Sequence, residues 1–132
     1  MSRPRIEHVN VTVSDPDRTA RLMGALFGWH VRWRGPARDG GHTIHCGSKE
    51  QYVALYTGHG VTYTADDFAK GRPLNHIGVE VDDLDAIEAR VVAAGLRPWG
   101  HDNYVPGRRF YFLDPDGIEY EVVSYAPSSG QN

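Results

Sequence analysis

Two histidines and one glutamate occupy positions where their side chains could act together. His8 lies in the stretch EHVNVTVSD, His76 lies in NHIGVEVDD 68 positions later, and Glu121 follows the turn sequence DPDG. Two imidazoles and one carboxylate can hold a divalent cation on one side and leave up to three positions open for water or substrate. This donor set suits one divalent metal ion per site, with Fe, Mn, Zn, Co and Ni as candidates.

The stretches around the two histidines alternate between apolar and polar residues, which is the pattern of a half-buried strand. Each histidine falls on the polar face, opposite a row of β-branched residues. The first stretch runs into Ser14-Asp15-Pro16, which predicts the start of a helix that ends at Gly28. The second runs into a helix predicted over residues 84–94, which Gly95 ends.

The two halves of the chain read as copies of one β-α-β-β-β unit. The strand, helix and closing glycine of the first half recur in the second at an offset of 67 or 68 positions. We therefore predict an α+β fold, in which two tandem βαβββ modules form a curved mixed sheet around a metal cavity. The expected bounds within a single domain of residues 1–132 are module one 6–57, linker 58–73, module two 74–125 and tail 126–132.

The duplication also predicts which positions are equivalent across the cavity. His8 matches His76, and Glu121 matches Ala54, so a fourth ligand position carries no donor atom. A closed structural zinc site would need a fourth protein ligand, so an open site is the better interpretation. The alternative is that the histidines only make hydrogen bonds while Glu121 pairs with Arg109.

Further cavity residues follow from the alternation of the strands. Asn10, Tyr52 and Tyr56 are expected to bind substrate, and Glu80 lies on the strand face of His76 as a candidate base. The remaining histidines are expected on the surface or in loops; they are His30, His42, His45, His59 and His101. The single cysteine, Cys46, reads as a small core residue.

Composition limits the classes of function. The net charge is −3, and the lysines and arginines are scattered along the chain, so the composition does not indicate nucleic-acid binding. No apolar run approaches the roughly 18 residues of a membrane helix, and no signal-peptide segment is evident. One cysteine excludes an internal disulfide framework, so a cytoplasmic protein is expected.

These motifs resemble the vicinal-oxygen-chelate superfamily, which includes glyoxalase I, bleomycin-resistance proteins, extradiol dioxygenases and fosfomycin-resistance thiol transferases. The resemblance covers residues 6–125 and rests on HVNVTVSD, NHIGVEVDDLDAIEARVVAAG and FYFLDPDGIEYEVV. It implies metal binding by His8, His76 and Glu121. It also implies a substrate-binding role for Tyr111. We expect Arg109, on the same face, to bind substrate as well, at the place where the fosfomycin transferases carry a small hydroxyl residue. Two chains of such proteins commonly align to complete each cavity, which implies a homodimer.

The leading hypothesis is therefore a metal-dependent enzyme that acts on a small oxygen-rich molecule bound through two oxygens. Tyr111 and Glu80 are the nearest candidates for its catalytic acid–base groups. Because position 54 is alanine, we expect little glyoxalase I activity, since the residue that members of that type carry there can serve as the base. The alternative is a metal-free resistance protein that binds an antibiotic or another small molecule in the same cavity.

Overall fold

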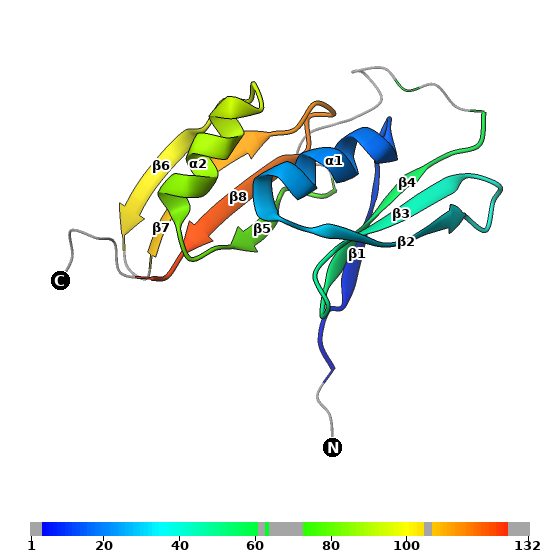
Figure 1. The fold of residues 1–132 in the computed structure, drawn as a ribbon, viewed down its shortest axis with the longest axis horizontal. Coiled ribbons are helices and arrows are strands. Elements are labelled where there is room, and N and C mark those ends of the chain that lie inside the picture. The colour runs from blue at the N-terminus through cyan, green and yellow to red at the C-terminus, as the bar shows by residue number, and fades with distance from the viewer. Residues whose placement is uncertain (1–3, 61–62, 64–72, 105–106, 127–132) are drawn as a thin grey trace. The chain divides into compact units, whose positions relative to one another are not determined.

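The computed structural model describes residues 4–60, 63, 73–104 and 107–126 (Figure 1). The chain divides into two compact units, Met1–Thr64 and Ala65–Asn132, which we call unit one and unit two and describe one at a time. Most of the expected linker and tail lies outside the described residues. The module bounds predicted from the sequence stay predictions.

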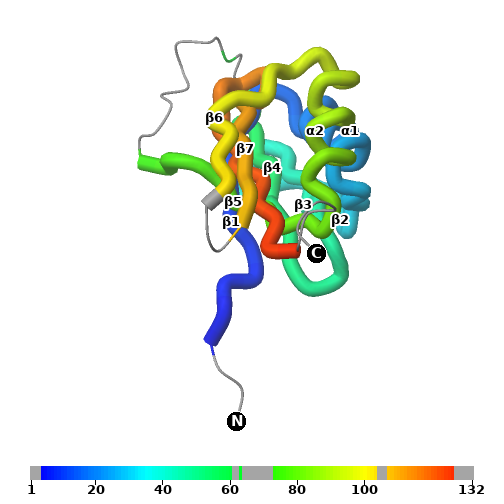
Figure 2. Tube along the Cα trace, turned by 90° about the vertical axis from the view of Figure 1, so that its left-hand side faces the viewer, coloured from blue at the N-terminus to red at the C-terminus, as the bar shows by residue number. Residues whose placement is uncertain are grey.

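Each unit is a four-stranded mixed sheet with one helix. Unit one contains β1 His8–Thr12, α1 Pro16–Phe27, β2 His30–Pro36, β3 His42–Gly47 and β4 Tyr52–Thr57. Unit two contains β5 Ile77–Glu80, α2 Leu84–Ala93, β6 Trp99–Tyr104, β7 Gly107–Leu113 and β8 Glu119–Ser124. The sheet orders are β1-β4-β3-β2 and β5-β8-β7-β6 (Figure 1), and Figure 2 shows the chain from a direction turned by 90°.

The two sheets share topology and register. In each, the first strand runs parallel to the last, and the other neighbours are antiparallel. Asn10 pairs with Ala54 in unit one, and Gly78 pairs with Glu121 in unit two. These pairs lie two residues after His8 and His76 respectively. The predicted α+β fold of tandem βαβββ modules is confirmed, with Ala54 and Glu121 at equivalent places.

The local sequence explains why helix α1 begins and ends where it does. The Asp15 side chain accepts a hydrogen bond from the Arg18 backbone N–H at 3.1 Å, and Pro16 occupies the first turn, where no backbone donor is needed. Gly28 ends the helix with φ of 73°, a left-handed conformation that favours glycine. In α2, Asp83 caps the Ala86 N–H in the same way at 3.0 Å.

The hydrophobic core of each unit lies between its helix and one face of its sheet. Alternation along the strands sends every second side chain to that face. The largest fully buried side chains are Val13, Met23, Leu26, Ile44 and Leu55 in unit one and Val91, Phe110, Phe112, Tyr120 and Val122 in unit two. The face opposite the helix carries polar and aromatic side chains that include His45 and Tyr52 in unit one and Tyr111 and Glu121 in unit two.

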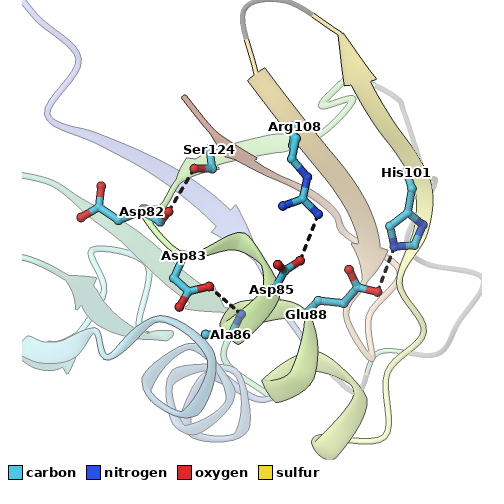
Figure 3. A network of polar contacts seen from close by, with 8 residues as sticks. All are labelled: Asp82, Asp83, Asp85, Ala86, Glu88, His101, Arg108 and Ser124. Atoms are coloured by element: carbon cyan, nitrogen blue, oxygen red, sulfur yellow. Dashed lines mark hydrogen bonds and ion pairs between the residues drawn. The ribbon is translucent and has the colours of Figure 1, made fainter. Parts of the chain in front are cut away.

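Polar contacts on the surface also join α2 to its sheet (Figure 3). Arg108 Nη2 lies 3.0 Å from Asp85 Oδ1, and His101 Nε2 lies 3.0 Å from Glu88 Oε2. Exposed pairs of this kind stabilise a fold by at most about 1 kcal/mol each. These ion pairs therefore contribute little to the free energy of unfolding. Burial of apolar side chains supplies most of it. Neither helix in the described part of the chain is long and apolar enough to cross a membrane.

The Cys46 thiol is expected to resist labelling in the folded protein. Its side chain is buried, its Sγ lies 4.0 Å from the carbonyl oxygen of Ala20, and burial raises the thiol pKa to about 11. At pH 8 only about one thiol in a thousand would be the reactive thiolate. Reaction with an aromatic disulfide reagent should be slow in buffer and fast in denaturing urea. Rapid labelling of the folded protein would contradict this burial.

Candidate metal centre

Unit two brings one predicted histidine and the predicted glutamate together. Phe110 and Phe112 of β7 are buried beneath α2, so Tyr111 between them belongs to the opposite face. Glu121 of β8 pairs with Tyr111 in the strand register and shares that face. The Nε2 atom of His76, just before β5, lies 2.9 Å from Glu121 Oε1.

The separation of these two atoms fits a shared metal ion. Two donors bound at right angles to one metal, each at about 2.1 Å, lie about 3.0 Å apart. The Nδ1 atom of His76 lies 2.7 Å from Asn75 Oδ1. When Nδ1–H donates to that amide oxygen, Nε2 is the ring nitrogen that can bind a metal ion beside Glu121.

The second oxygen of Glu121 is held by an arginine. Arg109 Nη1 donates to Glu121 Oε2 at 2.8 Å, and both side chains are only 13% exposed. This is the ion pair that the metal-free alternative anticipates. It also leaves Oε1 as the carboxylate oxygen nearest to His76. The predicted contact of Arg109 with substrate stays a prediction.

Aromatic side chains extend this face of unit two toward its edge strand. The Tyr111 ring meets the His76 ring edge-on at 5.9 Å, and the Trp99 ring lies 5.5 Å from Tyr111. Tyr111 covers Gly100 so closely that a Cβ there would come within 2.8 Å of its ring. An open cavity of about 330 Å³ is lined by Arg97, Trp99 and Leu113. Glu80, the other candidate base, is exposed in β5 and pairs with Val123.

The predicted residues of unit one lie on a single sheet. His8 stacks on Tyr52 with ring centroids 4.8 Å apart, and its Nδ1 lies 2.9 Å from Glu7 Oε1. Tyr56 donates a hydrogen bond to Asp39 Oδ2, which raises the pKa of the Tyr56 phenol. Within the described residues of either unit alone, no three His, Cys, Asp or Glu side chains gather around one point. The membership of His8 in the metal set therefore stays a prediction.

The sequence analysis missed three side chains on the same face of unit one, namely Arg32, Trp33 and His45. His45 was expected on the surface or in a loop, but it lies half-buried in β3 and stacks on Tyr52 with a centroid distance of 4.5 Å. Burial, with smaller contributions from His8 and Arg32, lowers the pKa of His45. The alternation of His45 with buried Ile44 and Cys46 would have placed it correctly.

The chain has a tandem βαβββ fold, and comparison with known proteins gives its family. The profile of the Glyoxalase/Bleomycin resistance protein/Dioxygenase superfamily matches residues 5–122, and the chain belongs to that superfamily. Glutathione transferase FosA of Serratia marcescens is 27% identical over 121 residues, which span 89% of this chain and 78% of the transferase.

Two solved structures show the same fold. A glyoxylase/bleomycin resistance protein/dioxygenase domain from Frankia sp. EAN1pec has a TM-score of 0.79 and 26% identity, covering 93% of this chain and 98% of that domain. TnmS3, an antibiotic-binding protein from Streptomyces sp. CB03234, has a TM-score of 0.70 and 22% identity, covering 94% and 98%. The proteins that are similar to this chain thus include one named as an enzyme and one named as a binding protein.

Proposed function

We propose that this protein is a divalent-metal-dependent enzyme that acts on a small, oxygen-rich organic molecule. The observation that carries the proposal is the 2.9 Å approach of His76 Nε2 to Glu121 Oε1 on a face that also presents Tyr111. His76 and Glu121 would hold the metal together with His8. The bound metal would act as a Lewis acid and a template for two substrate oxygens.

The chain's own residues would bind and orient the substrate and move its protons. Tyr111 adjoins His76 and could donate or accept a proton beside the metal ligands, whereas Glu80 is the exposed alternative on β5. The remaining residues that we assign to substrate binding are Asn10, Tyr52, Tyr56 and Arg109. The relationship to a glutathione transferase supports an enzyme, without assigning a reaction.

A metal-free binding protein is the second candidate, and one observation favours it. The pair of Arg109 with Glu121 satisfies the carboxylate without any metal ion. The antibiotic-binding protein TnmS3 shares the fold, which shows that the fold is compatible with such a role. Elemental analysis of protein purified without added metal separates the two candidates: about one divalent metal per chain is expected for the enzyme, and none for the binding protein.

The reaction class is tested by comparing two kinds of substrate. Metal-loaded protein should turn over the glutathione–methylglyoxal hemithioacetal poorly, because Ala54 offers no fourth ligand or base. A panel of catechols, which present two adjacent oxygens, is the comparison in the same assay. Robust isomerisation of the hemithioacetal would show that the fourth ligand is dispensable, and our interpretation of Ala54 would be wrong.

We also propose a homodimer, in which His8 completes a site whose other ligands come from the second chain. Sedimentation velocity at micromolar concentration should give about twice the monomer mass. Mixing a His8→Ala chain with a Glu121→Gln chain should then restore part of the metal binding that each variant lacks alone. A monomer under these conditions would remove this arrangement.

A further inference from the structure

A row of stacked rings crosses the whole sheet of unit one on the face opposite α1. His8 on β1 stacks on Tyr52 of β4 at 4.8 Å with only 6° between the ring planes. Tyr52 stacks on His45 of β3 at 4.5 Å and 22°, and His45 meets Trp33 of β2 at 5.1 Å and 51°. We call these four residues the ring row. It connects a proposed metal ligand to the outer edge of the sheet.

A bulge in the edge strand β2 places the side chains of Arg32 and Trp33 on this same face. Val31 pairs with Cys46 and Trp33 pairs with His45, so two steps along β2 correspond to one step along β3. Arg32 is the extra residue, and the bulge turns Trp33 to the same face as Arg32. The Arg32 Cζ atom lies 4.5 Å from the centroid of the Tyr52 ring. The ring row therefore has a guanidinium directly beside it.

The outermost ring of the row is open to solvent. Trp33 is 49% exposed, although a tryptophan normally buries most of its large apolar surface. Its ring lies over Gly35, where an added Cβ would come within 2.7 Å of the indole. The glycine lets the indole lie close to the strand, and His45 supports it from the side. An exposed, supported indole is a surface suited to stacking with another ring.

Unit two repeats the arrangement in its own sheet. Trp99 corresponds to Trp33 and Tyr111 corresponds to His45, each at an offset of 66 positions. Trp99 is 41% exposed and adjoins Tyr111, which in turn adjoins His76. In both units, therefore, rings lead from a predicted metal ligand to an exposed tryptophan. Such a repeat argues that the rings serve ligand binding, because the buried cores lie on the other faces.

We propose that the ring row binds a planar aromatic acid, whose ring stacks on Trp33 and whose carboxylate pairs with Arg32. Flat aromatic rings gain stacking energy on such a surface, whereas saturated rings of equal size do not. The guanidinium offers a cation to the acid group and disfavours an aromatic amine. This inference rests on the proposed function, since it names the substrate class of that site, but binding to the ring row itself requires no metal.

The test uses 2-naphthoate and its saturated counterpart, decahydro-2-naphthoate, on the full chain treated with a chelator. The two probes carry the same charge, so only flatness and aromaticity differ. Nitrogen-15 NMR resolves the indole N–H signals of Trp29, Trp33 and Trp99, which are assigned from single Trp→Phe variants. Trp29 is an internal reference because it packs on Phe27 instead of joining the ring row.

We expect 2-naphthoate to shift the Trp33 signal saturably and to bind at least about tenfold more tightly than decahydro-2-naphthoate. Trp33→Ala should weaken 2-naphthoate binding by a similar factor, measured by calorimetry. Gly35→Ala keeps the indole but displaces it, and should weaken binding several-fold even if Trp33→Ala proves poorly folded. Equal affinity for both probes, or full affinity in both variants, would overturn the inference. Because no metal is present, neither result bears on the metal site.

Discussion

Replacing Glu121 by glutamine should weaken the binding of a divalent metal at least about tenfold, which corresponds to a loss of about 1.4 kcal/mol. The amide keeps the size of the side chain but removes the negative charge and the basic oxygen that face His76 Nε2 at 2.9 Å. The fold should persist, because Glu121 does not belong to the apolar core. Titration calorimetry with Zn²⁺ and Mn²⁺ gives the affinity, and circular dichroism reports the fold.

The chain offers a matched control for this substitution. Glu88 also lies 3.0 Å from a histidine of the same unit, His101, but on the helix α2 side of the sheet (Figure 3). Glu88→Gln should leave metal affinity unchanged, whereas His76→Ala should reduce it as strongly as Glu121→Gln. Full metal occupancy of both site variants at stoichiometric loading would show that the ligands lie elsewhere.

Replacing Arg109 by methionine should lower the stability of the fold and raise its affinity for a divalent metal. The variant leaves Glu121 without its guanidinium partner. Removal of one member of a buried pair costs about 3–5 kcal/mol, and the residual exposure of this pair, 13% on each side, reduces the expected loss to about 2 kcal/mol. The metal should bind several-fold more tightly, because a competing cation has gone and Oε2 becomes available. Urea denaturation and calorimetry measure the two effects.

Arg108→Met is the control for Arg109→Met, since Arg108 is the preceding residue of the same strand. Its partner Asp85 is 71% exposed, so the loss of stability should stay below about 1 kcal/mol. Metal affinity should not change, because Arg108 contacts α2 and not the face of Glu121 (Figure 3). If Arg109→Met weakens metal binding, Arg109 supports Glu121 as a ligand instead of competing with the metal.

The duplicated fold of this protein could be predicted from its amino-acid sequence alone. Alternating apolar residues, helix caps at Asp15 and Asp83, and left-handed glycines at the end of α1 and just after the C-cap of α2 are local signals, and each has its own physical cause. Their recurrence at an offset of 67 or 68 positions also predicted that Ala54 and Glu121 are equivalent. The strand register then placed both residues at equivalent points of their sheets. Each pairs with the residue that lies two positions after the histidine of its own unit.

Which side chains meet on the face opposite each helix could not be predicted without the folded structure. The approach of Glu121 to both His76 and Arg109 depends on distances across strands that are far apart in the chain. The bulge that turns Trp33 toward His45 arises from a register shift, and strict alternation along β2 cannot reveal it. Side-chain periodicity assigns a residue to a face, but the pairing of strands determines its neighbours there.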